Sequence, residues 1–369
     1  MKILFLVNWK IHFLERDDET YQAPDKYISG KPYWFFRHFP TNIKVDVDVI
    51  DYSALPFMHK LESKYIKFYT IQAIKALINS RHYDLVISHG AQSAVAFAFL
   101  RTLMGKKMPP HLVIDAGCFN GARDDPRELM LIKMAARSLS GIIYHARIQY
   151  DYYARHMSSL LNRTVFIPFG VDSDYFFPQA SETGDYILSF GYLKRDYSTL
   201  INAWRRLDIK SLKLHIVGMN KIGAYGISDL PKNIKCTPRV PISTLKNLIA
   251  SARFVVIPLP YFRYSYGQMS ILQSMSMGKA VIVTRTPGVI DYVIDNENGF
   301  FVNPYDINDL SETIAKLLKN PQLSSSVGHN ARITVTADFN EKIMAERIYN
   351  FIMKTMARKK NLITVNYVG

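Results

Sequence analysis

The sequence predicts an α/β protein of two Rossmann-like domains, and three observations support this prediction. Short apolar runs alternate with amphipathic helical patterns along most of the chain, which is typical of parallel sheets covered by helices on both faces. The alternation stops once, in a segment rich in Pro, Gly and polar residues around 168–185, and then starts again. The length of 369 residues suits two hydrophobic cores better than one.

The first half contains six short apolar runs that we expect to be buried strands. They are Lys2–Val7, Val45–Ile50, Asp84–Ser88, Leu112–Ile114, Gly141–Tyr144 and Thr164–Ile167. Helical patterns fill the spaces at Tyr65–Ile78, Ala91–Leu103 and Arg127–Leu139. We therefore place a first Rossmann-like domain at residues 1–178.

The second half repeats the pattern. The expected strands are Tyr186–Phe190, Lys213–Val217, Asn233–Cys236, Phe254–Pro258, Ala280–Thr284 and Gly299–Val302. The expected helices are Ser198–Arg206, Ser243–Ala250, Ile271–Met277 and Ile307–Leu318. We place the second domain at residues 179–345. The helical, basic tail at 346–369 is expected to pack back on the first domain.

The amino-acid composition indicates where in the cell the protein is expected and which kinds of partner it could bind. The two cysteines, Cys118 and Cys236, do not make a disulfide scaffold, so a reducing cytoplasm is expected. No apolar run approaches the roughly 20 residues of a membrane span. The net charge of +15 indicates a basic surface, an anionic membrane or phosphorylated ligands, and the residues alone leave these open. Lysines in the amphipathic stretch 60–78 fit either peripheral contact with the inner face of a membrane or a helix packed on its own sheet.

Several common kinds of site are missing from the sequence. Neither half has a Gly-x-Gly-x-x-Gly turn after its first strand, which argues against a nicotinamide or flavin enzyme, and no Walker A motif is present. The histidines and cysteines show no metal-ligand spacing, so a metal-independent protein is expected. No recognised nucleic-acid motif appears, and no nucleic-acid partner is expected.

The stretch 265–284 reads as a loop, a helix, Gly278 and an apolar strand. A glycine-bearing loop that opens a helix offers unpaired N–H groups and the positive end of the helix dipole to one point, which suits anions and hydroxyls. The N–H groups of Gly267, Gln268 and Met269 are the candidate ligand contacts. Gly267 also fits an ordinary turn, and the sequence leaves both interpretations open.

Four blocks in the second half resemble one family in order and spacing. They are Val165–Asp172 with Phe176 and Pro178, Ser189–Ala203, Leu214–Gly218, and Ser265–Val302. Together they resemble glycosyltransferase family 4, the retaining nucleotide-sugar transferases of GT-B fold. The resemblance implies two Rossmann-like domains facing each other across a cleft, which close about the segment Pro168–Pro178. It assigns the acceptor to the first domain and the nucleotide-sugar donor to the second.

The resemblance also implies an activity. It implies retaining transfer of a sugar from a nucleoside-diphosphate sugar to a hydroxyl acceptor such as a glycan, a glycolipid or a small molecule, with no metal and no other cofactor. The family has two glutamates where this chain has Ser265 and Gln273. A second hypothesis is therefore a degenerate GT-B protein that acts as a binding or partner subunit.

Two basic residues are expected at the donor diphosphate. Its negative charge grows as the glycosidic bond breaks, so fixed cations lower the barrier. Arg195 matches the lysine of the family's basic pair and Lys194 lies beside it, whereas Tyr192 stands in place of the usual arginine. Both cations are candidate catalytic residues. The other interpretation is a solvated turn before a helix.

The resemblance assigns the sugar and the nucleoside to nearby positions. Ser265 stands where a family glutamate approaches the sugar hydroxyls, and Gln273 where another binds the ribose. Gln273 can still accept a hydrogen bond, or it is an ordinary helix residue. The base is expected against Arg239 and Val240. The complete set of donor-binding candidates is Gly30, Gly191, Arg239, Val240, Ser265, Gly267, Gln268, Met269 and Gln273.

The first half supplies two of the candidates. Gly30, in Ser29-Gly30-Lys31, is the candidate for the glycine loop that the family places near the diphosphate and the acceptor. His89 ends an expected strand and precedes a helix, where ligands gather in open α/β sheets. It is the third candidate catalytic residue, or else a hydrogen-bonded structural histidine.

Overall fold

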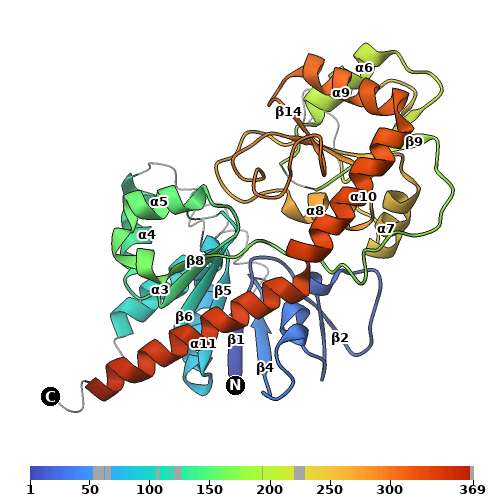
Figure 1. Cartoon of the computed structure of the whole chain (residues 1–369). Coiled ribbons are helices and arrows are strands. Elements are labelled where there is room, and N and C mark those ends of the chain that lie inside the picture. Colours follow the sequence, from blue (N-terminus) through green and yellow to red (C-terminus); the bar gives the residue numbers. More distant parts are fainter. Residues whose placement is uncertain are drawn as a thin grey trace. The chain divides into compact units, whose positions relative to one another are not determined.

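A computed structural model describes residues 1–52, 62, 68–104, 108–117, 119, 126–192, 194–219 and 229–365 (Figure 1). The chain divides into two compact units. Unit 1 comprises Met1–Pro168 and Met344–Gly369, and unit 2 comprises Phe169–Ile343. The division falls earlier in the chain than the expected boundary at 178. The chain after Met344 belongs to unit 1.

Unit 1 contains a six-stranded parallel sheet in the order β4-β1-β5-β6-β7-β8. Its strands are β1 (Lys2–Leu6), β4 (Asp46–Ile50), β5 (Leu85–His89), β6 (His111–Asp115), β7 (Gly141–Tyr144) and β8 (Thr164–Phe166). β5 and β6 are buried along their whole length, because both faces of a parallel sheet are covered. All six strands coincide with expected apolar runs to within one residue at each end.

The described helices of unit 1 differ more from expectation. They are α2 (Thr70–Asn79), α3 (Ala91–Met104), α4 (Pro126–Ala136), α5 (Gln149–His156) and α11 (Glu341–Val365). The sequence missed α5 and the small parallel pair β2 (His12–Leu14) and β3 (Lys26–Ile28). Of the lysines in the amphipathic stretch 60–78, Lys60, Lys64 and Lys67 lie outside the described residues, and Lys75 is exposed on α2.

Unit 2 contains a second six-stranded parallel sheet, in the order β11-β10-β9-β12-β13-β14. Its strands are β9 (Tyr186–Phe190), β10 (Lys213–Val217), β11 (Ile234–Thr237), β12 (Val255–Ile257), β13 (Val281–Thr284) and β14 (Phe300–Val302). Its described helices are α6 (Tyr197–Leu207), α7 (Ile242–Ser251), α8 (Gln268–Ser276), α9 (Ile307–Lys319) and α10 (Pro321–Asp338). Figure 1 shows α8 and α10 side by side in this unit.

The order of the strands places one crevice in each unit. In unit 1 the chain runs from β1 to β4 and then returns to the other side of β1 as β5. In unit 2 it runs from β9 through β10 to β11 and returns beside β9 as β12. Ligands of open α/β sheets bind outside the carboxyl ends of the strands at such a reversal. His89 ends β5 and Gly191 directly follows β9, so both lie at these positions.

The helices of unit 2 begin in different ways. The carboxylate of Asp196 accepts a hydrogen bond from Thr199 N at the start of α6, and Asp306 accepts bonds from two N–H groups at the start of α9. In contrast, α8 begins after Gly267, which has a φ of 89° and supplies no side-chain cap. The first N–H groups of α8 are therefore not satisfied by a capping side chain, and they lie in the segment expected to bind a ligand.

Gly328 in α10 is required by close packing. A Cβ atom at this position would lie 2.2 Å from Gly278 O and 3.0 Å from Ala280 N. Replacing a helical glycine by alanine normally gains about 1 kcal/mol, but overpacking costs about 1–3 kcal/mol. We expect Gly328→Ala to lower the Tm, measured by differential scanning calorimetry. Ser326→Ala, exposed on the same helix, should change stability by less than about 0.5 kcal/mol. A higher Tm for Gly328→Ala would contradict the packing argument.

Candidate functional site

Arg195 is the central residue of the candidate site in unit 2. It is only 7 % exposed. Its Nε donates a hydrogen bond to Phe190 O at 3.2 Å, and its Nη2 donates to Ser270 Oγ at 2.9 Å. These bonds hold the guanidinium between the end of β9 and the first turn of α8. A positive charge therefore lies beside a helix N-terminus that has no side-chain cap.

Gly191 provides the space for this arginine. Its φ is 145°, and a Cβ atom there would lie 2.3 Å from Nε and 2.4 Å from Cζ of Arg195. The guanidinium thus lies directly against the main chain where β9 ends. Only glycine permits this approach, which gives a physical reason for the Gly191 predicted from the sequence.

The loop before α8 is tightly held. A Cβ atom on Gly288 would lie 1.9 Å from Tyr264 O, so the two backbones touch. The Gln268 side chain donates a hydrogen bond to Gly288 O, which fixes the start of α8 against the same backbone. Ser265 and Gln273 are 6 % and 3 % exposed, and Met269 is half-buried. The Gly267 turn therefore has a defined position at the carboxyl edge of the sheet.

Lys194 is surrounded by aromatic rings. It has a φ of 48°, and its Nζ donates a hydrogen bond to Tyr264 Oη at 3.1 Å. The same ammonium lies 5.1–5.3 Å from the ring centroids of Phe262, Tyr264 and Tyr266. Cation–π attraction and one hydrogen bond therefore tie this exposed lysine to the loop that leads into α8.

A third cation lies at the same edge of the sheet. The Arg239 guanidinium lies 5.1 Å from the centre of the Tyr192 ring, and Val240 packs against the unit 2 core. Gly218, with a φ of 100°, leaves room for this tyrosine, because a Cβ atom there would lie 2.5 Å from its Cδ1. Tyr192, which stands in place of an arginine in the expected motif, thus positions an arginine from another strand end.

Unit 1 has its own cluster at the end of β5. His89 is 8 % exposed, its ring packs edge-on against Trp9 at 4.8 Å, and it lies 5.9 Å from Trp34. Its Nδ1 has no hydrogen-bond partner within the described residues. Gly30 is exposed after β3 with a φ of 75°, and a Cβ atom there would meet no atom within 4 Å. His89 therefore has a free polar atom in an aromatic setting, whereas Gly30 lies in open space in a backbone conformation that favours glycine.

Comparison with known proteins finds a family match in this part of the chain. Residues 172–334 match the family model described as glycosyl transferases group 1. This part of the chain is thus similar to that family, and the match covers less than half of the 369 residues. Arg195, Gly267 and Arg239 all lie inside the matched range.

The curated relatives that the chain matches include glycosyltransferases. The chain is 33% identical over 102 residues to the capsular polysaccharide biosynthesis glycosyltransferase CapM of Staphylococcus aureus, which is 27% of each chain. It is 24% identical over 206 residues to the MMP alpha-(1->4)-mannosyltransferase of Mycolicibacterium hassiacum, which is 52% of this chain and 48% of the relative. The chain thus spans from about a quarter to about half of these curated relatives.

Solved structures match the fold over almost the whole chain. Sucrose-phosphate synthase from Thermosynechococcus elongatus superposes with a TM-score of 0.71 at 18% identity, over 97% of this chain and 100% of the other. HepE from Anabaena, solved in complex with UDP-glucose, superposes with a TM-score of 0.67 at 16% identity, over 96% and 100%. The prediction of a GT-B protein with two Rossmann-like domains is therefore confirmed.

Several residues that line the site were missed in the sequence. Ser270 contacts Arg195, Gly288 supports the loop, and the rings of Phe262, Tyr264 and Tyr266 surround Lys194. Only the position of Ser270 in the first turn of the helix after Gly267 could have indicated it. The others depend on contacts between segments far apart in the chain.

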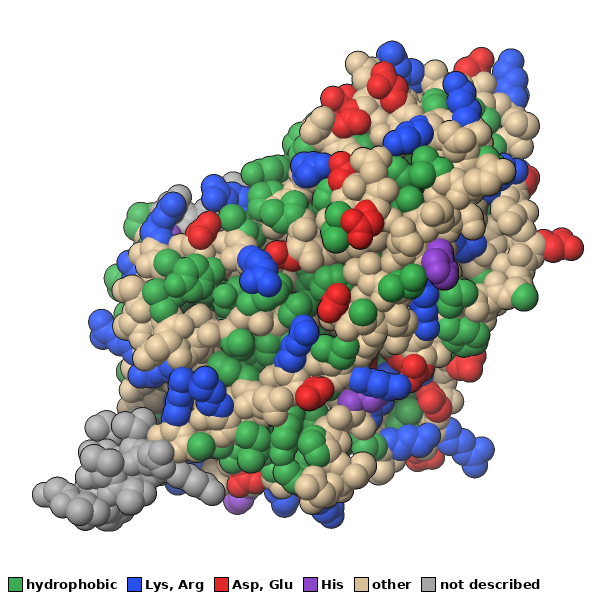
Figure 2. Space-filling view, viewed as in Figure 1, with side chains coloured by type: hydrophobic (Ala, Val, Ile, Leu, Met, Phe, Trp, Pro, Cys, Tyr) green, Lys and Arg blue, Asp and Glu red, His purple; other side chains and the backbone are tan. Residues whose placement is uncertain are grey.

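Two features of the described residues bear on partners. No group of three or more His, Cys, Asp or Glu side chains that could hold a metal ion occurs in the described part of the chain. None of the helices described here is long and apolar enough to cross a membrane. On the face shown in Figure 2, Lys and Arg side chains are scattered among Asp and Glu and do not gather in one patch.

Buried histidines of unit 1, among them His89 and His145, make its stability depend on pH. Burial, with a smaller effect of nearby His145, lowers the pKa of His89 to about 3, and burial lowers the pKa of His145 to about 4. At pH values between the unfolded pKa, near 6.5, and the folded pKa, the unfolded chain binds a proton at each of these histidines and the folded chain does not. Stability is therefore lost as the pH falls from 6.5 toward 3. We expect each histidine to lower the free energy of unfolding by about 2 kcal/mol between pH 7 and pH 5.

This dependence can be measured by urea unfolding at pH 7 and pH 5, followed by tryptophan fluorescence. In His89→Gln the difference in unfolding free energy between the two pH values should shrink by about 2 kcal/mol. The same exchange at exposed His82 is the matched control. An unchanged difference in His89→Gln would show that His89 is not held neutral in the folded protein.

Proposed function

We propose that the protein transfers a sugar from a nucleoside-diphosphate sugar to a hydroxyl acceptor, with retention of anomeric configuration. The observation that carries this proposal is the buried Arg195 guanidinium, which is hydrogen-bonded to Ser270 in the first turn of α8. A cation beside a helix N-terminus without a side-chain cap suits a diphosphate, whose charge increases as the sugar departs.

Three basic side chains would share the diphosphate and nucleoside. Arg195 offers a fork of N–H donors from a buried position, whereas Lys194 is an exposed point charge held by aromatic rings. Arg239, stacked on Tyr192, brings a second guanidinium to the same edge of the sheet. Because fixed cations and main-chain N–H groups supply the charge, we propose a reaction that needs no metal and no other cofactor.

Ser265 and Gln273 would bind the neutral parts of the donor. Both are buried next to the Gly267 turn or in α8, and both can donate and accept hydrogen bonds. Replacing a carboxylate by an amide removes a charge-assisted bond, which lowers affinity by about 1–2 kcal/mol without removing the contact. The proposed enzyme is thus compatible with a neutral pair at the positions of the two glutamates.

We assign the hydroxyl acceptor to unit 1, at the carboxyl end of β5. The Nδ1 atom of His89 has no partner within the described residues, and Trp9 and Trp34 provide flat apolar surfaces. Burial keeps the imidazole neutral, as its pKa of about 3 indicates, so it can form a hydrogen bond with an uncharged hydroxyl group.

A panel of UDP-, GDP- and ADP-sugars tests the proposal. We expect one donor to be turned over, with release of the nucleoside diphosphate and appearance of an α- or β-linked product whose anomeric configuration matches the donor by NMR. An inverted product would contradict the retaining mechanism. If calorimetry shows tight donor binding but no acceptor yields product, a binding subunit becomes the better description. Absence of binding to every donor would overturn the donor site itself.

A further inference from the structure

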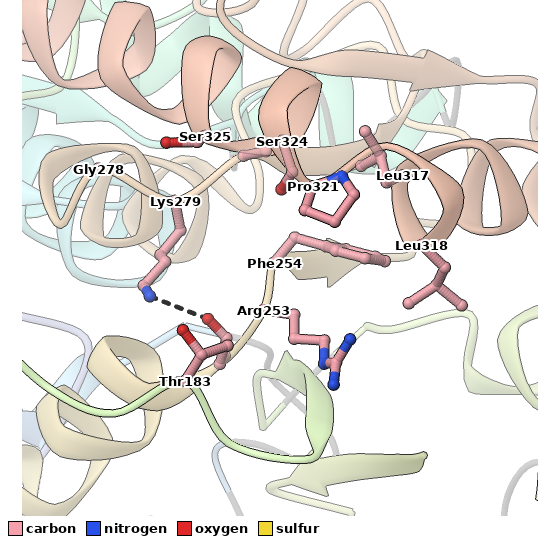
Figure 3. A pocket seen from close by; sticks show the side chains of 12 residues that line it. Thr183, Arg253, Phe254, Gly278, Lys279, Leu317, Leu318, Pro321, Ser324 and Ser325 are labelled. Atoms are coloured by element: carbon pink, nitrogen blue, oxygen red, sulfur yellow. Dashed lines mark hydrogen bonds between the residues drawn. The ribbon is translucent and has the colours of Figure 1, made fainter. Parts of the chain in front are cut away.

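A cavity of about 240 Å³ opens in unit 2, away from the candidate donor site (Figure 3). Phe254 and Ala280 line it and directly precede β12 and β13, so it lies at the amino ends of the strands. Arg195 and Gly267 belong to the carboxyl ends. Strands of three to five residues separate the two edges by roughly 10–17 Å. The cavity is therefore a separate site.

The cavity has a positive character. Lys279 Nζ donates one hydrogen bond to Ala252 O at 2.9 Å, drawn as a dashed line in Figure 3. An ammonium group has three donors, and no carboxylate pairs with Lys279 within the described residues. Arg253 lies exposed at the rim, and none of the described lining residues is Asp or Glu. A half-buried cation with spare donors favours an anionic ligand.

A hydroxyl group without a partner points into the same space. Ser324 is 8 % exposed, and its Oγ makes no hydrogen bond within the described part of the chain. In Figure 3 this hydroxyl points from α10 into the cavity, toward Phe254. Ser324 follows the start of α10 at Pro321, where no side chain caps the helix. The hydroxyl is open to the cavity near a helix N-terminus, so it can form a hydrogen bond with a ligand there.

The size and the apolar walls of the cavity limit which anionic ligands could bind there. A volume of about 240 Å³ equals roughly eight water volumes, more than a bare phosphate group needs. Phe254, Leu317 and Leu318 provide apolar contacts on the side of Pro321. We propose that the cavity binds a small phosphate monoester. Its phosphate lies between Lys279 and Ser324, and its carbon skeleton lies against Phe254 and Leu317.

Isothermal titration calorimetry with glycerol phosphate tests this proposal, using the full chain with Arg195→Ala so that the candidate donor site contributes little. We expect saturable binding with one equivalent. Lys279→Met should weaken binding by tenfold or more, which is about 1.4 kcal/mol. Ser324→Ala should weaken it about fivefold, as the loss of one hydrogen bond predicts. Lys319→Met and Ser326→Ala, which change the same groups outside the cavity, should leave binding unchanged.

Three results would overturn the proposal. The first is a lack of saturable binding to the folded Arg195→Ala protein. The second is an unchanged affinity in both Lys279→Met and Ser324→Ala. Ser324→Ala removes no hydrogen bond of the folded protein, so this variant is expected to fold. The third is equal affinity for inorganic phosphate and glycerol phosphate, which would remove the monoester assignment. None of these results depends on whether the chain turns over a nucleotide sugar.

Discussion

Arg195→Ala is expected to lower kcat for sugar transfer by roughly 10²–10³-fold. The guanidinium is the buried cation of the candidate site, and its bonds to Phe190 O and Ser270 Oγ fix it at one point. Charge that develops on the leaving diphosphate loses its pre-positioned partner, and losing one such donor costs about 2.7–4 kcal/mol. The measurement is a steady-state assay of released nucleoside diphosphate with the donor that the panel identifies.

Arg195→Lys is the matched variant, because it keeps the charge but not the planar fork of donors. We expect it to retain more activity than Arg195→Ala and to remain below the unchanged protein. The Tm of both variants must be measured, since a buried arginine also contributes to folding. Full activity in a folded Arg195→Ala protein would remove Arg195 from the diphosphate site.

Gly191→Ala is expected to be nearly as damaging although it adds only a methyl group. The φ of 145° strains any other residue, and the new Cβ would lie 2.3 Å from Arg195 Nε. The arginine must therefore move away from the first turn of α8. Misplacing a catalytic group by about 1 Å can cost 10²-fold, so we expect a loss of about that size in kcat.

A double-mutant cycle separates this mechanism from general damage. If Gly191→Ala acts by displacing Arg195, adding it to Arg195→Ala should lower kcat little further, because the displaced group is already absent. Losses that multiply in the double variant would show that Gly191 acts on the reaction by another route. A crystal structure of Gly191→Ala should show the guanidinium no longer bonded to Ser270.

The candidate site is formed by segments that could be recognised in the sequence, whereas the contacts between these segments could not be predicted from it. Arg195 and Gly267 were recognised in local motifs, whereas Arg239 was placed by the family resemblance alone. The three residues follow different strands of one sheet. The pairing of Arg195 with Ser270 spans 75 residues, and no local pattern predicts it. The stacking of Arg239 on Tyr192 depends in the same way on β9 and β11 lying on either side of β10.

Errors in the expected elements have a similar origin. The helix α10 contains many Ser, Thr and Val residues and Gly328, which are weak helix formers, and its packing on the Gly278 segment stabilises it instead. The helix α5 is short and rich in Tyr, and β2 and β3 have only three residues each. Such elements form because of tertiary contacts, so their local sequence does not predict them.

The sequence by itself determined the two parallel sheets, their order along the chain and the segments that carry positive charge and glycine. It could do so because buried strands and amphipathic helices have local periodicities that one chain segment displays. Only the tertiary structure decided that Gly191 makes room for Arg195, that Tyr192 holds Arg239, and that Lys279 and Ser324 line a second cavity. These contacts join residues that are far apart in the sequence. They depend on the tertiary structure because the connections between strands determine which segments become neighbours.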